Sequence, residues 1–312
     1  MKQIFRLISS QLALLTFAGA VVAYIYPPFF LVFKDYFLWF FAATMFSLGL
    51  VLEPADLKAE IVQPKRVALG VLTQFSVMPL LVWLVAQYPG FSPAVAIGFI
   101  IVGCAPGAMA SNVIVYLAGG AVAFSVTLTT VATLMSPVLT PLLVKYLGGA
   151  IMPVEFWPLT ITIVKTVLLP LLIGLLVQKR LGRYLQDARD MAPGVAALAI
   201  IIICSYAVSA NQARIAEMAF PVFLGVVLVN LLGYVIGWWL AKLYGFSHLY
   251  RITLMIEIGM QNAGMGVALA LKHFPAESAL PGALFAVWCI LTAAIASSWL
   301  RRRIKQSQLL AG

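Results

Sequence analysis

One carboxylate lies deep inside a hydrophobic segment of this chain. Glu257 falls within the apolar stretch 256–266, with Gln261 four residues further on and Asn262 directly after it. A charge in hydrocarbon costs about 2.5 kcal/mol or more, so an intramembrane acid indicates a functional site with a partner. We expect that partner to be a cation.

Neutral oxygens near this carboxylate would complete a cation site. A dehydrated hard cation takes oxygen ligands, and one carboxylate with hydroxyl, amide and carbonyl oxygens can replace its water without excess charge. Glu257 and Gln261 share a face if their helix is continuous, and Ser125 and Thr129 have the same spacing. Hydroxyls in this segment can instead bond back to their own helix carbonyls, and the segment also holds Thr127, Thr130, Thr133, Ser136 and Thr140.

The composition places these residues in a membrane. Hydrophobic residues make up 63% of the 312 residues and charged residues only 10%, which excludes an ordinary soluble domain. Apolar runs of about 20 residues, the length that crosses a bilayer, recur along the chain. They predict an all-α polytopic membrane protein with ten transmembrane helices, at about 8–26, 37–53, 67–88, 93–118, 122–147, 156–178, 192–210, 219–242, 250–272 and 279–300.

The net charge of +10 is explained by its position along the chain, without a nucleic-acid partner. With a cytoplasmic N-terminus, fifteen basic residues fall on the cytoplasmic side and four on the other, a strong positive-inside bias. Both termini are therefore expected in the cytoplasm. The Arg301–Lys305 cluster is interpreted as a cytoplasmic stop signal with secondary contact to anionic membrane lipid. Lys165 falls inside the sixth span, where it either snorkels to the interface or faces a cavity.

The first span has a second interpretation. Lys2 and Arg6 precede an apolar run that ends in the small residues 18–20, a pattern that resembles a secretory signal peptide. The run continues to Tyr26, which favours a spanning helix. Three cysteines fall in predicted spans without a CxxC pair and are interpreted as small buried hydrophobes: Cys104, Cys204 and Cys289.

The fourth and ninth spans are interrupted by helix-weakening residues. The fourth carries Pro106-Gly107 in mid-span followed by Ser111-Asn112, and the ninth carries glycines around Glu257. Gly and Pro are also common packing residues in membrane helices. Paired interruptions at corresponding positions of two halves, however, point to a transporter binding site near the midplane. Five helices in each half, an odd number, predict an inverted repeat with units 1–150 and 151–312.

These motifs together resemble the bile acid:sodium symporter family. The resemblance rests on Pro106-Gly107 through Ser111-Asn112, the Gly119-Gly120 turn, 125–129 and 257–262. It is nearest to bacterial homologues of the apical sodium-dependent bile acid transporter and covers the whole chain. It implies a core domain and a panel domain, with the fourth and ninth helices crossing at unwound centres, in a bacterial cytoplasmic (inner) membrane. The chain departs from the family at Ala121, where relatives commonly have a polar residue.

The resemblance also implies two sodium ions and their ligands. The first ion would be bound by Ser111, Asn112, Ser125, Thr129 and Glu257. The second would be bound by Gln74, Glu257, Gln261 and the backbone carbonyls of Ile258 and Met260. Substrate contacts would come from Asn112 and Asn262 beside the cavity, and from Thr292, a hydroxyl in the tenth span.

The predicted function is sodium-coupled symport of an organic anion, bile acid-like or a smaller carboxylate, by alternating access. A proton-coupled carrier is the near alternative, because a desolvated carboxylate can hold a proton instead. A passive channel is less favoured, because paired broken helices are typical of carriers. An intramembrane enzyme is disfavoured, because HExxH, GxSxG and paired-acid motifs are absent and no Asp lies in a predicted span. Substrate identity and oligomeric state are not predicted.

Overall fold

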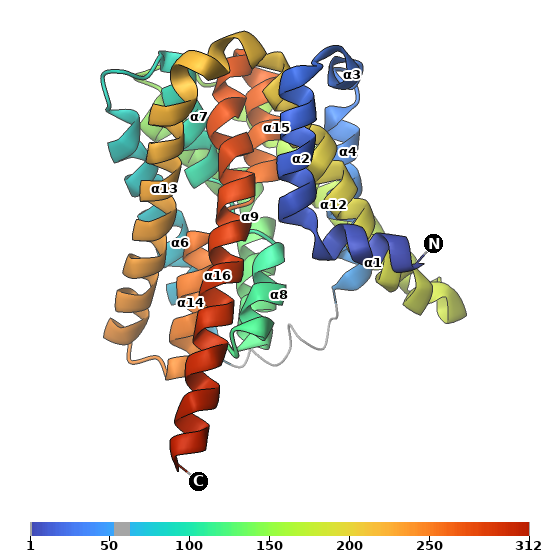
Figure 1. Ribbon diagram of the computed structural model, residues 1–312, viewed down its shortest axis with the longest axis vertical. Coiled ribbons are helices and arrows are strands. Elements are labelled where there is room, and N and C mark those ends of the chain that lie inside the picture. The colour runs from blue at the N-terminus through green and yellow to red at the C-terminus, as the bar shows by residue number, and fades with distance from the viewer. Residues whose placement is uncertain (1, 53–62, 312) are drawn as a thin grey trace.

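The protein is built of helices throughout the residues that the structure describes, which are 2–52 and 63–311. Figure 1 shows this computed structural model, in which no strand occurs over those two ranges. Six helices in them are long and apolar enough to cross a membrane, and a bent pair at the N-terminus would make seven. The expectation of an all-α membrane protein is therefore confirmed.

The helices follow one another along the chain with short connections. In chain order they are α1 (Lys2–Ser10), α2 (Leu12–Ile25), α3 (Pro28–Leu31), α4 (Phe37–Val51), α6 (Pro64–Ala86), α7 (Pro93–Gly103), α8 (Ala110–Leu117), α9 (Val122–Gly148), α10 (Phe156–Ile163), the π-helical segment η1 (Val164–Leu168), α11 (Leu169–Gln178), the 3₁₀ segment η2 (Gly182–Tyr184), α12 (Leu185–Ala210), α13 (Gln212–Leu243), α14 (His248–Gly259), α15 (Ala263–His273), the 3₁₀ segment η3 (Ala276–Ala279) and α16 (Leu280–Ala311).

The predicted first span, 8–26, is wrong as a single helix. The segments Gln3–Ser9 and Leu14–Ile25 meet at 78°, and Gln11 leaves the helical conformation between them. The polar residues 9–11 interrupt the apolar pattern at this bend. The last residue of the predicted 37–53 span and Lys58 lie outside the described residues.

The sixth span, predicted at 156–178, is present but irregular. Its middle, η1, is a π-helical turn that contains Lys165. Pro170 follows directly in α11 and has no N–H for the carbonyl four residues earlier, which explains the widened turn. The Lys165 side chain is exposed.

The predicted interruptions in the fourth and ninth spans are both present. The fourth span divides into α7 and α8, and the ninth divides into α14 and α15. Figure 1 shows α7 and α15 in the upper half of the molecule and α8 and α14 in the lower half. Each broken span thus supplies one half-helix to each half of the molecule.

Glycines let α13 approach the end of α14 closely. A Cβ atom at Gly237 would lie 3.1 Å from the Leu254 carbonyl oxygen, and one at Gly233 would lie 3.2 Å from the Gly259 Cα. A Cβ atom at Gly259 itself would lie 2.2 Å from the Tyr234 ring. Small residues at helix contacts are how membrane helices gain packing.

Gly259→Ala should destabilise the protein by about 1–3 kcal/mol, because the added methyl group overlaps the Tyr234 ring. Gly264→Ala is the matched control: its Cβ would meet nothing nearer than 3.6 Å. Alanine in a helix is expected there to be neutral or slightly stabilising. Thermal unfolding of both variants in detergent measures the difference. Equal melting temperatures would contradict this account of the α13–α14 contact.

Candidate functional site

The breaks of the two interrupted spans are bonded to each other. The Ala108 N–H donates to the Met260 carbonyl at 3.0 Å, and the Asn262 N–H donates to the Pro106 carbonyl at 2.9 Å. Gly107 and Gln261 pair between these bonds as an isolated antiparallel bridge. Each unwound segment therefore satisfies backbone groups of the other, as buried backbone requires.

Four helix ends meet at this point. The helices α7 and α14 end here with their carbonyl ends, and α8 and α15 begin here with their N–H ends. Helix N-termini carry about half a positive charge and C-termini about half a negative charge. The breaks consequently offer a place for a cation near the carbonyl ends and for an anion near the N–H ends.

Glu257 lies at the centre of an oxygen cluster drawn from three helices. The carboxylate is buried, with 1% of the residue exposed. The hydroxyls of Ser111, on α8, and Ser125, on α9, both contact its Oε1. Thr129, one turn along α9, donates to Oε2 at 2.8 Å. Four of the five residues predicted for the first cation are thus in direct contact.

The fifth, Asn112, is reached through Ser125, whose hydroxyl lies 2.7 Å from Asn112 Oδ1. Ser111 Oγ also lies 2.6 Å from the Ala108 carbonyl. Ser111 and Ser125 each lie between two acceptors, so neither hydroxyl donates fully to both. A proton or a cation bound among these oxygens would relieve that competition.

Gly107 closes one side of this cluster with bare backbone. A Cβ atom there would lie 3.0 Å from Glu257 Oε2. A larger residue after Pro106 would push the carboxylate away from the break.

The residues predicted for the second cation are collected beside the first group. Gln74, on α6, donates from Nε2 to Gln261 Oε1 at 2.8 Å, and Gln261 donates to the Ile258 carbonyl at 3.1 Å. The Met260 carbonyl lies in the bonded break itself. Gln74 is buried in an apolar span, and only the family resemblance had singled it out.

Asn262 has a structural role that its sequence position did not suggest. Its Oδ1 accepts the Met265 N–H at 3.1 Å and so caps α15. Because a backbone N–H donates to an oxygen, this bond distinguishes Oδ1 from Nδ2 in the Asn262 amide. The NH₂ group of Asn262 is left to donate elsewhere.

Thr292 lies apart from the oxygen cluster. Its hydroxyl, on α16, lies 2.9 Å from Asn230 Oδ1 and 3.3 Å from the Tyr234 hydroxyl. Asn230 was missed, although an asparagine amid the apolar 219–242 span is the kind of signal that marks a buried polar contact.

Other polar residues serve packing. As expected, Thr130, Thr133 and Ser136 bond to carbonyls of their own helix. Thr140 does not: it donates to the Cys104 carbonyl at 2.8 Å and so satisfies the end of α7. The three cysteines are free and buried, as predicted.

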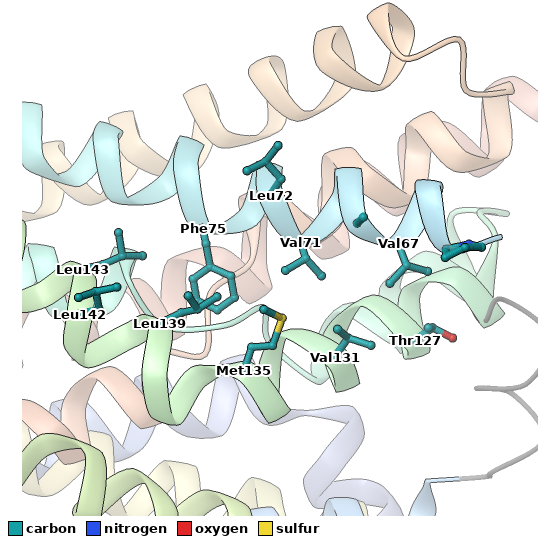
Figure 2. Close-up of a pocket in the computed structure, with 12 residues that line it drawn as sticks. Val67, Val71, Leu72, Phe75, Thr127, Val131, Met135, Leu139, Leu142 and Leu143 are labelled. Carbon is teal, nitrogen blue, oxygen red and sulfur yellow. The ribbon is translucent and has the colours of Figure 1, made fainter. Parts of the chain in front are cut away.

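An apolar groove between α6 and α9 is a separate feature. It encloses about 620 Å³, and Figure 2 shows side chains such as Val71, Phe75 and Met135 along it. Its only polar side-chain group among the lining residues is the Thr127 hydroxyl. Leu72, which also lines it, is 64% exposed, so the groove fits a lipid acyl chain better than a charged ligand.

Comparison with known proteins decides the family. The model of the Sodium Bile acid symporter family matches residues 38–218. The chain belongs to this family. It is 35% identical to an uncharacterized sodium-dependent transporter, YocS, of Bacillus subtilis, over 93% of this chain and 90% of that protein.

More distant members of the Sodium Bile acid symporter family carry more specific names. The chain is 32% identical to the probable chloroplastic sodium/metabolite cotransporter BASS1 of Arabidopsis thaliana, over 84% of this chain and 66% of that protein. It is 27% identical to the ileal sodium/bile acid cotransporter of Oryctolagus cuniculus, over 76% of this chain and 69% of that protein. These family members are named as transporters, so the chain is not assigned to a class of enzymes.

Asn262→Ala should lower the stability of the protein by about 1 kcal/mol, because α15 loses its cap. Asn262→Ser keeps a capping oxygen and should unfold close to the wild-type temperature. Melting curves of the purified variants make the comparison. If the serine and alanine variants melt together below the wild type, the cap is not the cause.

Proposed function

We propose that the chain is a secondary active transporter that couples sodium to an organic anion at the paired breaks. The buried Glu257 carboxylate and the hydroxyl oxygens around it carry this proposal, because one carboxylate with several neutral oxygens is the ligand set that a dehydrated hard cation takes. The names of the relatives favour sodium as that charge.

Two sodium ions would share the Glu257 carboxylate. The first would take the oxygens of Ser111, Asn112, Ser125, Thr129 and Glu257. The second would take Gln74, Glu257 and Gln261 with the carbonyls of Ile258 and Met260. The contacts within each set support the grouping: Ser111, Ser125 and Thr129 contact the carboxylate, and Gln74, Gln261 and the Ile258 carbonyl are bonded to one another. Two cations with one carboxylate leave a net positive charge.

An organic anion fits the remaining groups. The N-termini of α8 and α15 bring partial positive charge to the same place. The NH₂ groups of Asn112 and Asn262 would donate to the anion, and Thr292 would add a hydroxyl from α16. We propose a bile acid-like molecule or a smaller carboxylate, in keeping with the bile acid and metabolite cotransporters among the relatives.

The proposed architecture is ten helices in two inverted repeats, 1–150 and 151–312, sorted into core and panel domains. The matching order of the breaks, α7–α8 and α14–α15, supports it. Movement of the core against the panel would expose the site to alternate sides. We place the protein in a bacterial cytoplasmic (inner) membrane with both termini in the cytoplasm, on the distribution of basic residues and the bacterial relative.

Glu257→Ala should abolish sodium-dependent uptake while the protein still inserts, because it removes the one ligand that both proposed ions share. Glu257→Gln keeps the size and one oxygen but removes the charge, and we expect at least a tenfold loss of sodium affinity. Glu155→Gln is the matched control, because Glu155 is an exposed acid outside the breaks. Uptake into vesicles with equal amounts of each protein gives the comparison. Wild-type uptake by Glu257→Ala would overturn the assignment.

A proton could bind the same carboxylate in place of sodium, and a test of the driving ion distinguishes a sodium-coupled from a proton-coupled carrier. In proteoliposomes we expect an inward sodium gradient to drive uptake of radiolabelled bile acids or small carboxylates, and a pH gradient in sodium-free buffer to drive none. Uptake under the pH gradient alone would favour the proton carrier. A conductance far above carrier turnover would instead indicate a channel.

A further inference from the structure

Asn230 is a buried asparagine that lies outside both proposed ion sites. It donates a hydrogen bond to the carbonyl of Gly259, the residue between the proposed ligands Ile258 and Met260. Asn230, on α13, has no exposed surface, and its Nδ2 donates to the Gly259 carbonyl at 2.8 Å. Gly259 is the last residue of α14, where carbonyls have no partner in their own helix. A carbonyl without a partner is costly at membrane depth, so this bond stabilises the interrupted conformation.

A second helix holds Asn230 in place. Thr292 Oγ1, on α16, lies 2.9 Å from Asn230 Oδ1, and the Tyr234 hydroxyl lies 3.3 Å from Thr292 Oγ1. Thr292 Oγ1 also lies 3.0 Å from the Trp288 carbonyl and 3.2 Å from the Cys289 carbonyl of its own helix, and the Asn230 oxygen is the nearest of its three acceptors. We infer one direction of donation along the chain. Tyr234 donates to Thr292, Thr292 donates to Asn230, and Asn230 donates to Gly259. The chain of bonds joins α13, α16 and the end of α14.

Close packing leaves this chain little freedom to shift. A Cβ atom at Gly233 would lie 3.3 Å from the Ile258 carbonyl oxygen, and a Cβ atom at Gly237 would lie 3.1 Å from Ile258 Cβ. The backbone of α13 therefore lies against Ile258, whose carbonyl the second ion would use. Asn230 lies one turn from Gly233 and Tyr234 on the same face.

We propose that Asn230 and Thr292 are positioning residues for the second sodium site. By holding the Gly259 carbonyl, they set the peptide planes on either side, and so aim the Ile258 and Met260 carbonyls at the ion. This inference rests on the proposed function, in which those two carbonyls are sodium ligands. Neither Asn230 nor Thr292 touches the ion. Because Thr292 is on α16, its hydrogen bond to Asn230 would also couple sodium binding to the position of that helix.

Sodium binding to the purified full-length protein tests the proposal without a known substrate. The measurement is the rise in melting temperature with sodium chloride, with choline chloride keeping the ionic strength constant, and radioactive sodium binding as a second readout. Thr292→Val removes only the hydroxyl, and we expect half-saturation at about fivefold higher sodium, the order expected from one buried hydrogen bond. Thr292→Ser restores the hydroxyl and should rescue the affinity. Asn230→Leu should weaken binding at least as much.

Two controls make the outcome specific. Thr44→Val also removes a buried hydroxyl, but that hydroxyl bonds only a carbonyl of its own helix, so sodium half-saturation should not change. A purely stabilising role for Thr292 would lower the melting temperature without sodium and leave half-saturation unchanged, which would overturn the proposal.

Glu257→Ala distinguishes failure of the positioning role from failure of the proposed function. Wild-type binding by that variant refutes the proposed function itself. Loss of binding there, with unchanged affinity in Thr292→Val and Asn230→Leu, refutes only the positioning role.

Discussion

A backbone group buried in hydrocarbon has to find its hydrogen-bond partner within the protein, and the centre of this molecule is organised by that requirement. The Pro106 and Met260 carbonyls are satisfied by N–H groups from the opposite break. The ends of α7 and α14 are satisfied by side chains, from Thr140 and Asn230. Neither interrupted span could keep its unwound segment alone. The two breaks are therefore one structural unit.

The proposed ion chemistry depends on that unit. Unwinding brings Glu257 against the bare backbone of Gly107 and within reach of hydroxyls from α8 and α9. A continuous helix in either span would direct its carbonyls along its own axis and would leave the carboxylate without these partners. The cost of interrupting the helices is offset by the hydrogen bonds between the breaks.

Much of this site could be predicted from the chain. Glu257 was identifiable because an acid in an apolar run is costly, and the breaks were identifiable because Pro106-Gly107 and the glycines near Glu257 weaken helices. The sequence indicates where a helix is weak, but not which other segment bonds the backbone groups that the break leaves free. The bond from Asn230 to Gly259 joins residues 29 apart through packing, and no local pattern encodes it. The bend at Gln11 was missed for a similar reason, because hydropathy measures where a run is apolar and not where it turns.

The shared hydroxyl of Ser125 bears on how sodium and the anion would be coupled at the site. Its single hydrogen lies between two acceptors, Asn112 Oδ1 and Glu257 Oε1. In an empty site the Asn112 amide would gain by turning its NH₂ toward these oxygens. A sodium ion held by the same oxygens would favour the opposite orientation, with Oδ1 on the ion and NH₂ toward the cavity. Sodium would then favour binding of the anion, because the loaded site presents the Asn112 donor in addition to that of Asn262.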